Sequence, residues 1–178
     1  PLVEQAVRLM LDKEPQDTLS SEELARVTEL FITRDTPCKD IMSFYHTHEE
    51  QNKNRFYETG PIMTLKDMAL LPNLRTLCLA SQQIKEVTEI ANLPHLFQLE
   101  LRCNDVSDIS PLSGLKELAM VGLNSNPVKD ISPLASCKSI NLLDLHGASN
   151  YDGKALALFG DFSFLDISND TDSYRYLG

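Results

Sequence analysis

The chain has 178 residues, with 16 basic against 26 acidic side chains, a formal net charge of −10 and a pI near 4.8. This charge argues against non-specific binding to nucleic acid and against docking on anionic lipid, because both need cations that neutralise phosphate. A hydrophobic fraction of 42% is ordinary for a globular protein, and no apolar run reaches the roughly 18 residues of a membrane-spanning helix. We therefore expect one domain, no nucleic-acid partner and no membrane insertion.

Residues 1–35 predict an N-terminal helical cap. Apolar side chains between residues 2 and 12 recur at helical spacing. A second helix is expected to follow Ser20, because Ser-Ser-Glu-Glu places Glu23 at the third helical position of a capping box. The segment 27–32 also fits the apolar pattern that repeats later in the chain. The cap therefore ends either in a second helix or in a degenerate first repeat.

Residues 36–61 are expected to form an insertion or loop. They hold four of the chain's 7 phenylalanines and 5 tyrosines. Long segments without a repeat position are often functional. An alternative places residues 52–61 in a poorly matching strand, with Arg55 and Tyr57 in apolar positions. We favour the insertion, because a charged side chain in a core position is costly.

Residues 62–167 contain an internal repeat of 22 residues. Its first half is a three-point apolar pattern, Leu-x-x-Leu-x-Leu, which is typical of a short strand with alternate side chains on opposite faces. The second and third apolar residues of each copy are expected to point into the core. The copies begin at positions 74, 96, 118, 140 and 162.

The second half of the repeat carries an apolar residue at every third position, which favours a 3-10-like arm over a long α-helix. Asp-Ile-Ser-Pro-Leu occurs at 108–112 and again at 130–134. Between strand and arm, Asn104 and Asn126 are expected to form a buried ladder that satisfies main-chain groups at the turns. Gln82, Ala148 and Asp170 replace asparagine in the other copies and are expected to weaken the ladder at its ends.

The consensus Leu-x-x-Leu-x-Leu-x-x-Asn-x-Val-x-Asp-Ile-Ser-Pro-Leu resembles the 22-residue leucine-rich repeat of bacterial internalin-like proteins. The resemblance covers residues 62–167. It implies an α/β solenoid, a right-handed superhelix with parallel strands on its concave side and a helical cap before the first repeat. One unit cannot bury its apolar face alone, so the units must stack. Residues 168–178 are expected to form an acidic tail.

The strand positions that alternate with the core positions are expected to be exposed on the concave face, and Cys78 and Ala80 belong to this set. Met120, Leu142 and Phe164 form one column between polar columns, a pattern typical of a protein interface. We therefore expect a monomeric, non-catalytic module, without cofactor or metal, that binds a protein or peptide partner. The expected contact residues are Gln98, Glu100, Arg102, Met120, Asn124, Leu142, Asp144, His146, Phe164 and Asp166.

Two other functions have candidate residues. A hydrolytic enzyme could use Asp144 and His146 with Ser168 as a third group, although a nucleophile also needs an oriented base. A metal-binding protein could use His46 and His48 on the insertion loop, although two histidines do not fill a tetrahedral site.

The cysteines indicate a compartment. Their spacing fits neither a zinc site nor a dense disulfide framework, so reduced thiols are expected. Reduced thiols favour the cytoplasm. The four residues are Cys38, Cys78, Cys103 and Cys137.

Overall fold

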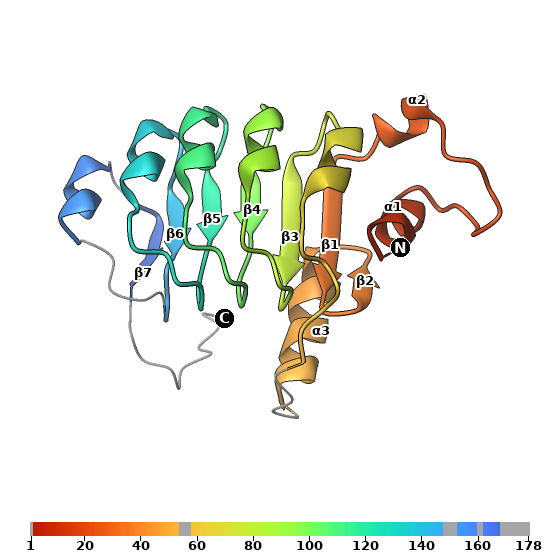
Figure 1. Ribbon diagram of the computed structural model, residues 1–178, viewed down its shortest axis with the longest axis horizontal. Helices are drawn as coiled ribbons and strands as arrows, with labels where there is room; N and C mark the ends of the chain where they lie inside the picture. The colour runs from red at the N-terminus through yellow and green to blue at the C-terminus, as the bar shows by residue number, and fades with distance from the viewer. Residues whose placement is uncertain (1, 54–57, 148–152, 160–161, 168–178) are drawn as a thin grey trace.

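The computed structural model describes residues 2–53, 58–147, 153–159 and 162–167. In this part of the chain, coils stack side by side, with strands on one side and 3-10 helices on the other (Figure 1). The strands form one sheet in the order β2-β1-β3-β4-β5-β6-β7, in which only β2 is antiparallel to its neighbour. The expected leucine-rich-repeat solenoid is confirmed. The strands are β1 (Glu29–Thr33), β2 (Thr36–Cys38), β3 (Thr76–Ala80), β4 (Gln98–Glu100), β5 (Met120–Gly122), β6 (Leu142–Asp144) and β7 (Phe164–Asp166).

The return arms of the coils form short 3-10 helices, as the three-residue apolar spacing predicts. Pro111 and Pro133 lie in the first turns of their helices, where a missing main-chain N–H costs nothing. None of the described helices is long and apolar enough to cross a membrane. The 3-10 helices are η1 (Lys66–Leu70), η2 (Thr88–Asn92), η3 (Ser110–Gly114), η4 (Ser132–Ser136) and η5 (Gly153–Leu158).

Aliphatic side chains of successive coils meet as neighbours and form a continuous spine. Leu77 pairs with Leu99, Leu99 with Val121, and Val121 with Leu143. All four side chains are fully buried. Burying one such side chain stabilises a protein by about 1.5–3 kcal/mol. Because each coil buries its neighbours, the spine holds the strands in a fixed register.

Strands β3 to β6 each lead into a turn that repeats with the same 22-residue period. Ser81, Cys103 and Ser125 all adopt left-handed backbone conformations, with φ between 53° and 55°, and Gly147 follows with φ 66°. The residue after each of the first three turns points its amide side chain inward. Asn104 accepts a hydrogen bond from the Ile84 amide (3.1 Å) and donates to the carbonyls of Leu79 and Leu101 (2.8 and 2.9 Å).

Gln82 continues the ladder, contrary to the expectation that it weakens it. Its Oε1 accepts from the Ile62 amide (3.1 Å), and its Nε2 donates to the carbonyl oxygen of Arg34 (2.6 Å). The longer side chain fits because residue 60 is glycine: a Cβ there would lie 2.2 Å from both Gln82 Oε1 and the Arg34 oxygen. Ala148 and Asp170 lie outside the described residues.

The N-terminal cap contains α1 (Leu2–Met10), which packs on β1 and β2, and a single helical turn, α2 (Ser21–Leu24). Ser20 and Glu23 form the expected capping box, with main-chain to side-chain distances of 3.2 and 3.0 Å. The helix ends at Leu24, and the chain then enters β1. There Leu30 pairs with Leu77 in the same register that links later repeats. Of the two interpretations of segment 27–32, the structure supports the second, because this segment contains the strand of a degenerate repeat.

Residues 36–61 contain β2 and a helix, α3 (Ile41–Lys53), which lies across the ends of β1 and β3 (Figure 1). Since β1 pairs directly with β3, the described residues of 52–61 add no strand between them. Phe44 of α3 is fully buried against Phe31 of β1, with ring centroids 6.4 Å apart. This contact is on the sheet face opposite the spine. That outer face, away from the 3-10 helices, is called the concave face.

Candidate functional site

Helix α3 covers the concave face over β1 and β3. Cys78 and Ala80 form a small apolar cluster with Phe31, Phe44 and Cys38. Both residues of β3 are fully buried, so the expectation that they are exposed on this face is wrong. Burial raises the pKa of the Cys78 thiol well above its usual value, which argues against a reactive thiolate at this position. The open part of the face therefore begins at β4.

Three large apolar side chains follow one another across β5, β6 and β7. Met120 pairs with Leu142, and Leu142 pairs with Phe164. Each is half-buried, so part of each side chain reaches solvent although it lies within a sheet. Gln98 of β4 precedes them in the same line. We call Met120, Leu142 and Phe164 the apolar row.

A second line of concave positions carries carboxylates two residues further along the strands. We call Glu100, Asp144 and Asp166 the acidic row. Gly122 lies between Glu100 and Asp144 in the strand register. A Cβ at Gly122 would lie 2.3 Å from Glu100 Oε2, so the missing side chain leaves room for the Glu100 carboxylate.

Glu100 and Arg102 form a buried ion pair, contrary to the expectation that both are exposed. Arg102 Nη2 lies 2.6 Å from Glu100 Oε2, and the Arg102 amide donates to Glu100 Oε1 at 3.0 Å. The guanidinium also lies over the ring of Tyr45 in α3, 4.9 Å from its centroid. The two charged residues are only 4% and 6% exposed. They form the border between α3 and the open surface.

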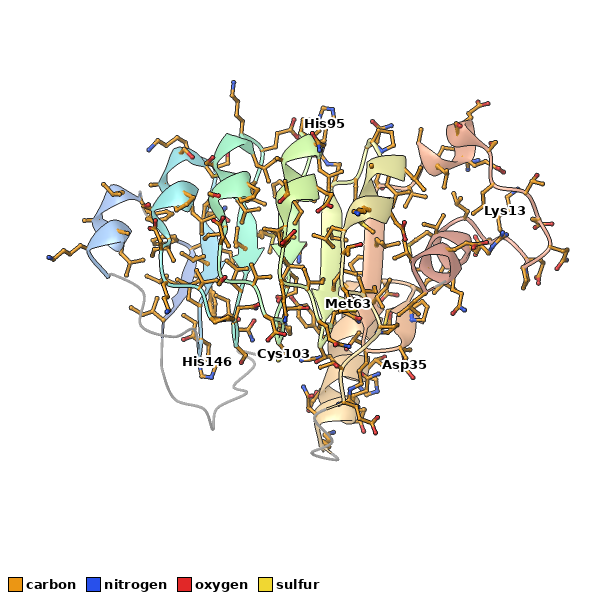
Figure 2. All side chains as sticks on the ribbon, viewed as in Figure 1. Lys13, Asp35, Met63, His95, Cys103 and His146 are labelled. Carbon is orange, nitrogen blue, oxygen red and sulfur yellow. The ribbon has the colours of Figure 1, made fainter. Side chains whose placement is uncertain are left out.

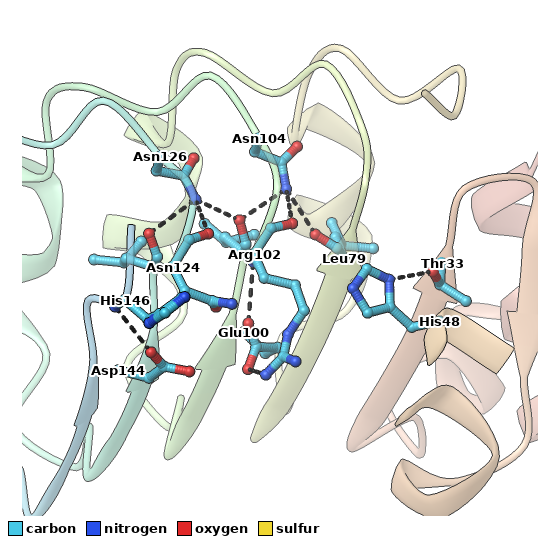
Figure 3. Close-up of polar contacts among 12 residues, drawn as sticks. Thr33, His48, Leu79, Glu100, Arg102, Asn104, Asn124, Asn126, Asp144 and His146 are labelled. Atoms are coloured by element: carbon cyan, nitrogen blue, oxygen red, sulfur yellow. Dashed lines mark hydrogen bonds and ion pairs between the residues drawn. The ribbon is translucent and has the colours of Figure 1, made fainter. Parts of the chain in front are cut away.

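The third line of concave positions continues from Arg102 to Asn124 and His146 at the carboxyl ends of the strands. Figure 2 places His146 at this edge of the sheet together with Cys103, and His95 at the opposite edge. Asn124 is 5% exposed, so it also differs from the expected exposed residue. Its Oδ1 is buried and has no hydrogen-bond partner among the described residues. The amide lies between Glu100 and Asp144 (Figure 3).

Asp144 and His146 do not form the contact that a hydrolytic dyad needs. Asp144 Oδ1 accepts a hydrogen bond from the main-chain amide of His146 at 3.0 Å, so this contact fixes the turn and does not orient the imidazole. The imidazole Nδ1 lies 3.9 Å from Asp166 Oδ1 on the neighbouring strand. Burial raises the pKa of the Asp144 carboxyl. Ser168, the candidate third group, lies outside the described residues.

The two histidines of the metal hypothesis lie on helix α3 and not on a loop. His48 is fully buried, whereas His46 is exposed, because residues two apart on a helix point to different sides. Asn52 Nδ2 lies 3.0 Å from His48 Nε2, and Thr33 Oγ1 lies 3.1 Å from Nδ1. An amide nitrogen only donates, so Nε2 accepts and the Nδ1 hydrogen is directed to Thr33. These contacts give His48 a structural role.

Burial, with the nearby guanidinium groups of Arg102 and Arg34, lowers the pKa of His48 to about 3. Cys38 Sγ contacts the carbonyl oxygen of Thr36 at 3.7 Å. No group of three or more potential metal ligands occurs among the residues that the structure describes.

Two contributors to this surface were missed from the sequence. One is Tyr45, which is placed by the packing of α3, so no local pattern identifies it. The other is Gly122. Here the sequence does carry a signal, because a glycine within a strand often marks the close approach of another group.

No family model matches the chain, and no curated protein sequence matches it. Several solved structures do. An internalin C2 from Listeria monocytogenes has 21% identity and a TM-score of 0.51, over 97% of this chain and 88% of that one. The leucine-rich-repeat ectodomain of the receptor kinase SOBIR1 from Arabidopsis thaliana has 22% identity and a TM-score of 0.52, over 64% of this chain and 66% of that one.

A leucine-rich-repeat protein from Leptospira interrogans has 21% identity and a TM-score of 0.56, over 64% of this chain. The match spans 30% of the Leptospira protein's length. At these identities the likeness concerns the fold. The chain has a leucine-rich-repeat solenoid fold of the internalin-like type.

Proposed function

We propose that the protein is a non-catalytic interaction module that binds a protein or peptide partner on the concave face between α3 and β7. The observation that carries this proposal is the apolar row. Three large side chains, Met120, Leu142 and Phe164, stand in register on adjacent strands and remain partly exposed. Apolar anchors inside a polar border are typical of the centre of a protein interface.

The rigidity of the sheet supports the same proposal. The positions of Met120 and Leu142 are set by the buried residue that follows each of them in sequence, Val121 and Leu143, which pair in the spine. A surface that is held in its binding shape loses little conformational entropy when a partner binds. Tyr45 and Arg102 form the border of the open concave surface on the side of α3, so a partner would lie over β4 to β7.

The cysteines bear on where the module acts. None of the four, all of which the structure describes, forms a disulfide. Structural disulfides belong to oxidising compartments, whereas reduced thiols are usual in the cytoplasm. We propose that the protein acts there.

The test uses one substitution in the apolar row and one matched substitution outside it. A partner is first isolated from the source cells with the intact protein, purified, and titrated by calorimetry. Leu142→Glu is expected to weaken binding at least about tenfold, because it places a charge among the anchors. Leu70→Glu changes an equally apolar residue that is 59% exposed on η1, and it is expected to leave the affinity unchanged.

Thermal unfolding of both variants, followed by circular dichroism, shows whether each remains folded. Phe164→Ser replaces Leu142→Glu if the latter unfolds. Equal affinities of the folded row variant and the Leu70→Glu control would contradict the proposed binding face.

A further inference from the structure

An apolar cavity of about 270 Å³ lies between the N-terminal cap and the first return arm. Figure 1 shows the two cap helices, α1 and α2, at one end of the solenoid. Because residues of η1 also border the cavity, it lies on the 3-10-helix side of the sheet and is separate from the concave face. Its aliphatic walls come from α1, from the region of α2 and from the residue after η1. These residues are Val3, Val7, Leu19, Leu24 and Leu71.

Polar contacts outside the cavity hold its walls in place. Arg8 of α1 donates from Nη1 to the carbonyl oxygens of Glu14 and Asp17, at 2.8 and 2.9 Å, and so fixes the loop 11–19 to α1. At the other end of α2, Asn73 Nδ2 donates to the carbonyl oxygen of Ala25 at 2.8 Å and ties the cap to the next coil. The capping box fixes α2 itself. A ligand would therefore enter a cavity that is already formed and would lose little affinity to the ordering of loops.

The volume and the walls of the cavity restrict the size and the polarity of a ligand. An apolar cavity of roughly 150 Å³ can bind benzene, whereas sites for drug-sized ligands begin at roughly 300 Å³. A cavity of about 270 Å³ lies between these values and suits one aromatic ring, or a short alkyl chain, with a small polar group. Aliphatic walls offer water few hydrogen-bond partners, so the enclosed part of the ligand is expected to be apolar.

The charge at the mouth of the cavity selects the polar group. Two carboxylates, Glu4 and Asp67, border the cavity. Glu4 Oε1 is paired with Arg8 Nη2 at 2.7 Å, so its charge is already balanced. Asp67 lies in the first turn of η1 and is exposed, and its side chain has no ion pair or hydrogen bond to any residue that the structure describes. A cationic group beside Asp67 would be attracted, whereas an anionic group would be repelled. The net charge of −10 acts in the same direction.

We propose that this cavity is a binding site for a small apolar amine, whose ring or alkyl chain packs against Val7 and Leu24 while its ammonium group lies beside Asp67. The ligand class is an arylalkyl or alkyl amine with one ring or a short chain. The site goes beyond the proposed function, because it is formed by the cap and η1 and shares no residue with the concave face. Its test therefore leaves the proposed function unaffected.

The test compares three probes that share a phenyl ring and a two-carbon spacer and differ in charge: phenethylamine, 2-phenylethanol and 3-phenylpropanoate. Each is titrated into the intact, ¹⁵N-labelled protein at low salt, and the amide NMR signals of the cavity residues report binding. Leu19→Trp fills the cavity, and Leu24→Trp replaces it if thermal unfolding shows that Leu19→Trp is not folded. Asp67→Asn removes the charge at the mouth. The matched control is Glu86→Gln, which removes one exposed carboxylate elsewhere and gives the same net charge.

Phenethylamine is expected to bind the wild type at least about threefold more tightly than 2-phenylethanol, and 3-phenylpropanoate is expected to bind most weakly. Asp67→Asn is expected to abolish the difference between the amine and the alcohol, whereas Glu86→Gln keeps it. The filled variant is expected to bind both probes at least about tenfold more weakly, because the added ring occupies their space. The inference is overturned if no probe binds, if the amine and the alcohol bind the wild type equally, if Asp67→Asn and Glu86→Gln act alike, or if the filled variant keeps the wild-type affinity.

Discussion

The asparagine ladder allows a stability prediction that can be worked from individual hydrogen bonds. Asn126 is 2% exposed. Its Oδ1 accepts from the Val106 amide at 3.0 Å, and its Nδ2 donates to the carbonyl oxygens of Leu101 and Leu123 at 2.8 and 3.1 Å. A further contact joins Nδ2 to the carbonyl oxygen of Asn124 at 3.3 Å, and Asn126→Ala removes all four contacts at once. Because the buried Val106 amide and the buried Leu123 carbonyl then lose the partner that Asn126 gives them, at roughly 1–3 kcal/mol for each group, the expected loss of unfolding free energy is about 3 kcal/mol.

The assay is urea unfolding followed by circular dichroism, with Asn73→Ala as the matched control. Asn73 is exposed and its side chain donates one hydrogen bond, to the carbonyl oxygen of Ala25 at 2.8 Å. Its replacement is expected to cost less than about 1 kcal/mol, because water replaces the lost contact. The reasoning is refuted if the two substitutions lower the free energy of unfolding by the same amount.

Two further predictions concern the first coil. The pKa of His48 is about 3, below the usual 6.5, so the folded state favours the neutral imidazole. The stability that this preference contributes is present above pH 6.5 and is lost as the pH falls toward 3. When the pH is lowered from 7 to 5, the free energy of unfolding of the wild type is expected to fall by about 2 kcal/mol more than that of His48→Gln. Urea unfolding at both pH values measures the two changes. Identical changes would show that His48 does not titrate in this way. Gly60→Ala is expected to lower the free energy of unfolding by about 2 kcal/mol, because its Cβ would lie 2.2 Å from Gln82 Oε1 and the Arg34 carbonyl oxygen. Thermal unfolding unchanged from the wild type would contradict this close approach.

The fold could be predicted from the sequence because the coils that contain β3 to β6 share one local pattern. The spacing of Leu77, Leu99, Val121 and Leu143 places aliphatic side chains one coil apart, and only stacking can bury them. The role of Gln82 could not be predicted in the same way. It depends on Gly60, which is remote from the turn in sequence and leaves room for the longer side chain.

The concave face was harder to predict than the core. Alternation along a strand correctly separates Cys78 and Glu100 from the spine, but it does not say what covers them. Helix α3 buries Cys78 through Phe44, and Tyr45 stacks on Arg102 to close the border of the open surface. These contacts join residues that are more than 30 positions apart, so they follow from tertiary packing and have no periodic signal.

The most direct test of the concave-face proposal is site-specific photo-cross-linking. A benzophenone amino acid placed at Leu142 is expected to form a covalent adduct with the bound partner, because Leu142 is the middle residue of the apolar row. The same amino acid placed at the exposed Leu70 on η1 is expected to give none. An adduct formed from position 70 and absent from position 142 would contradict the account.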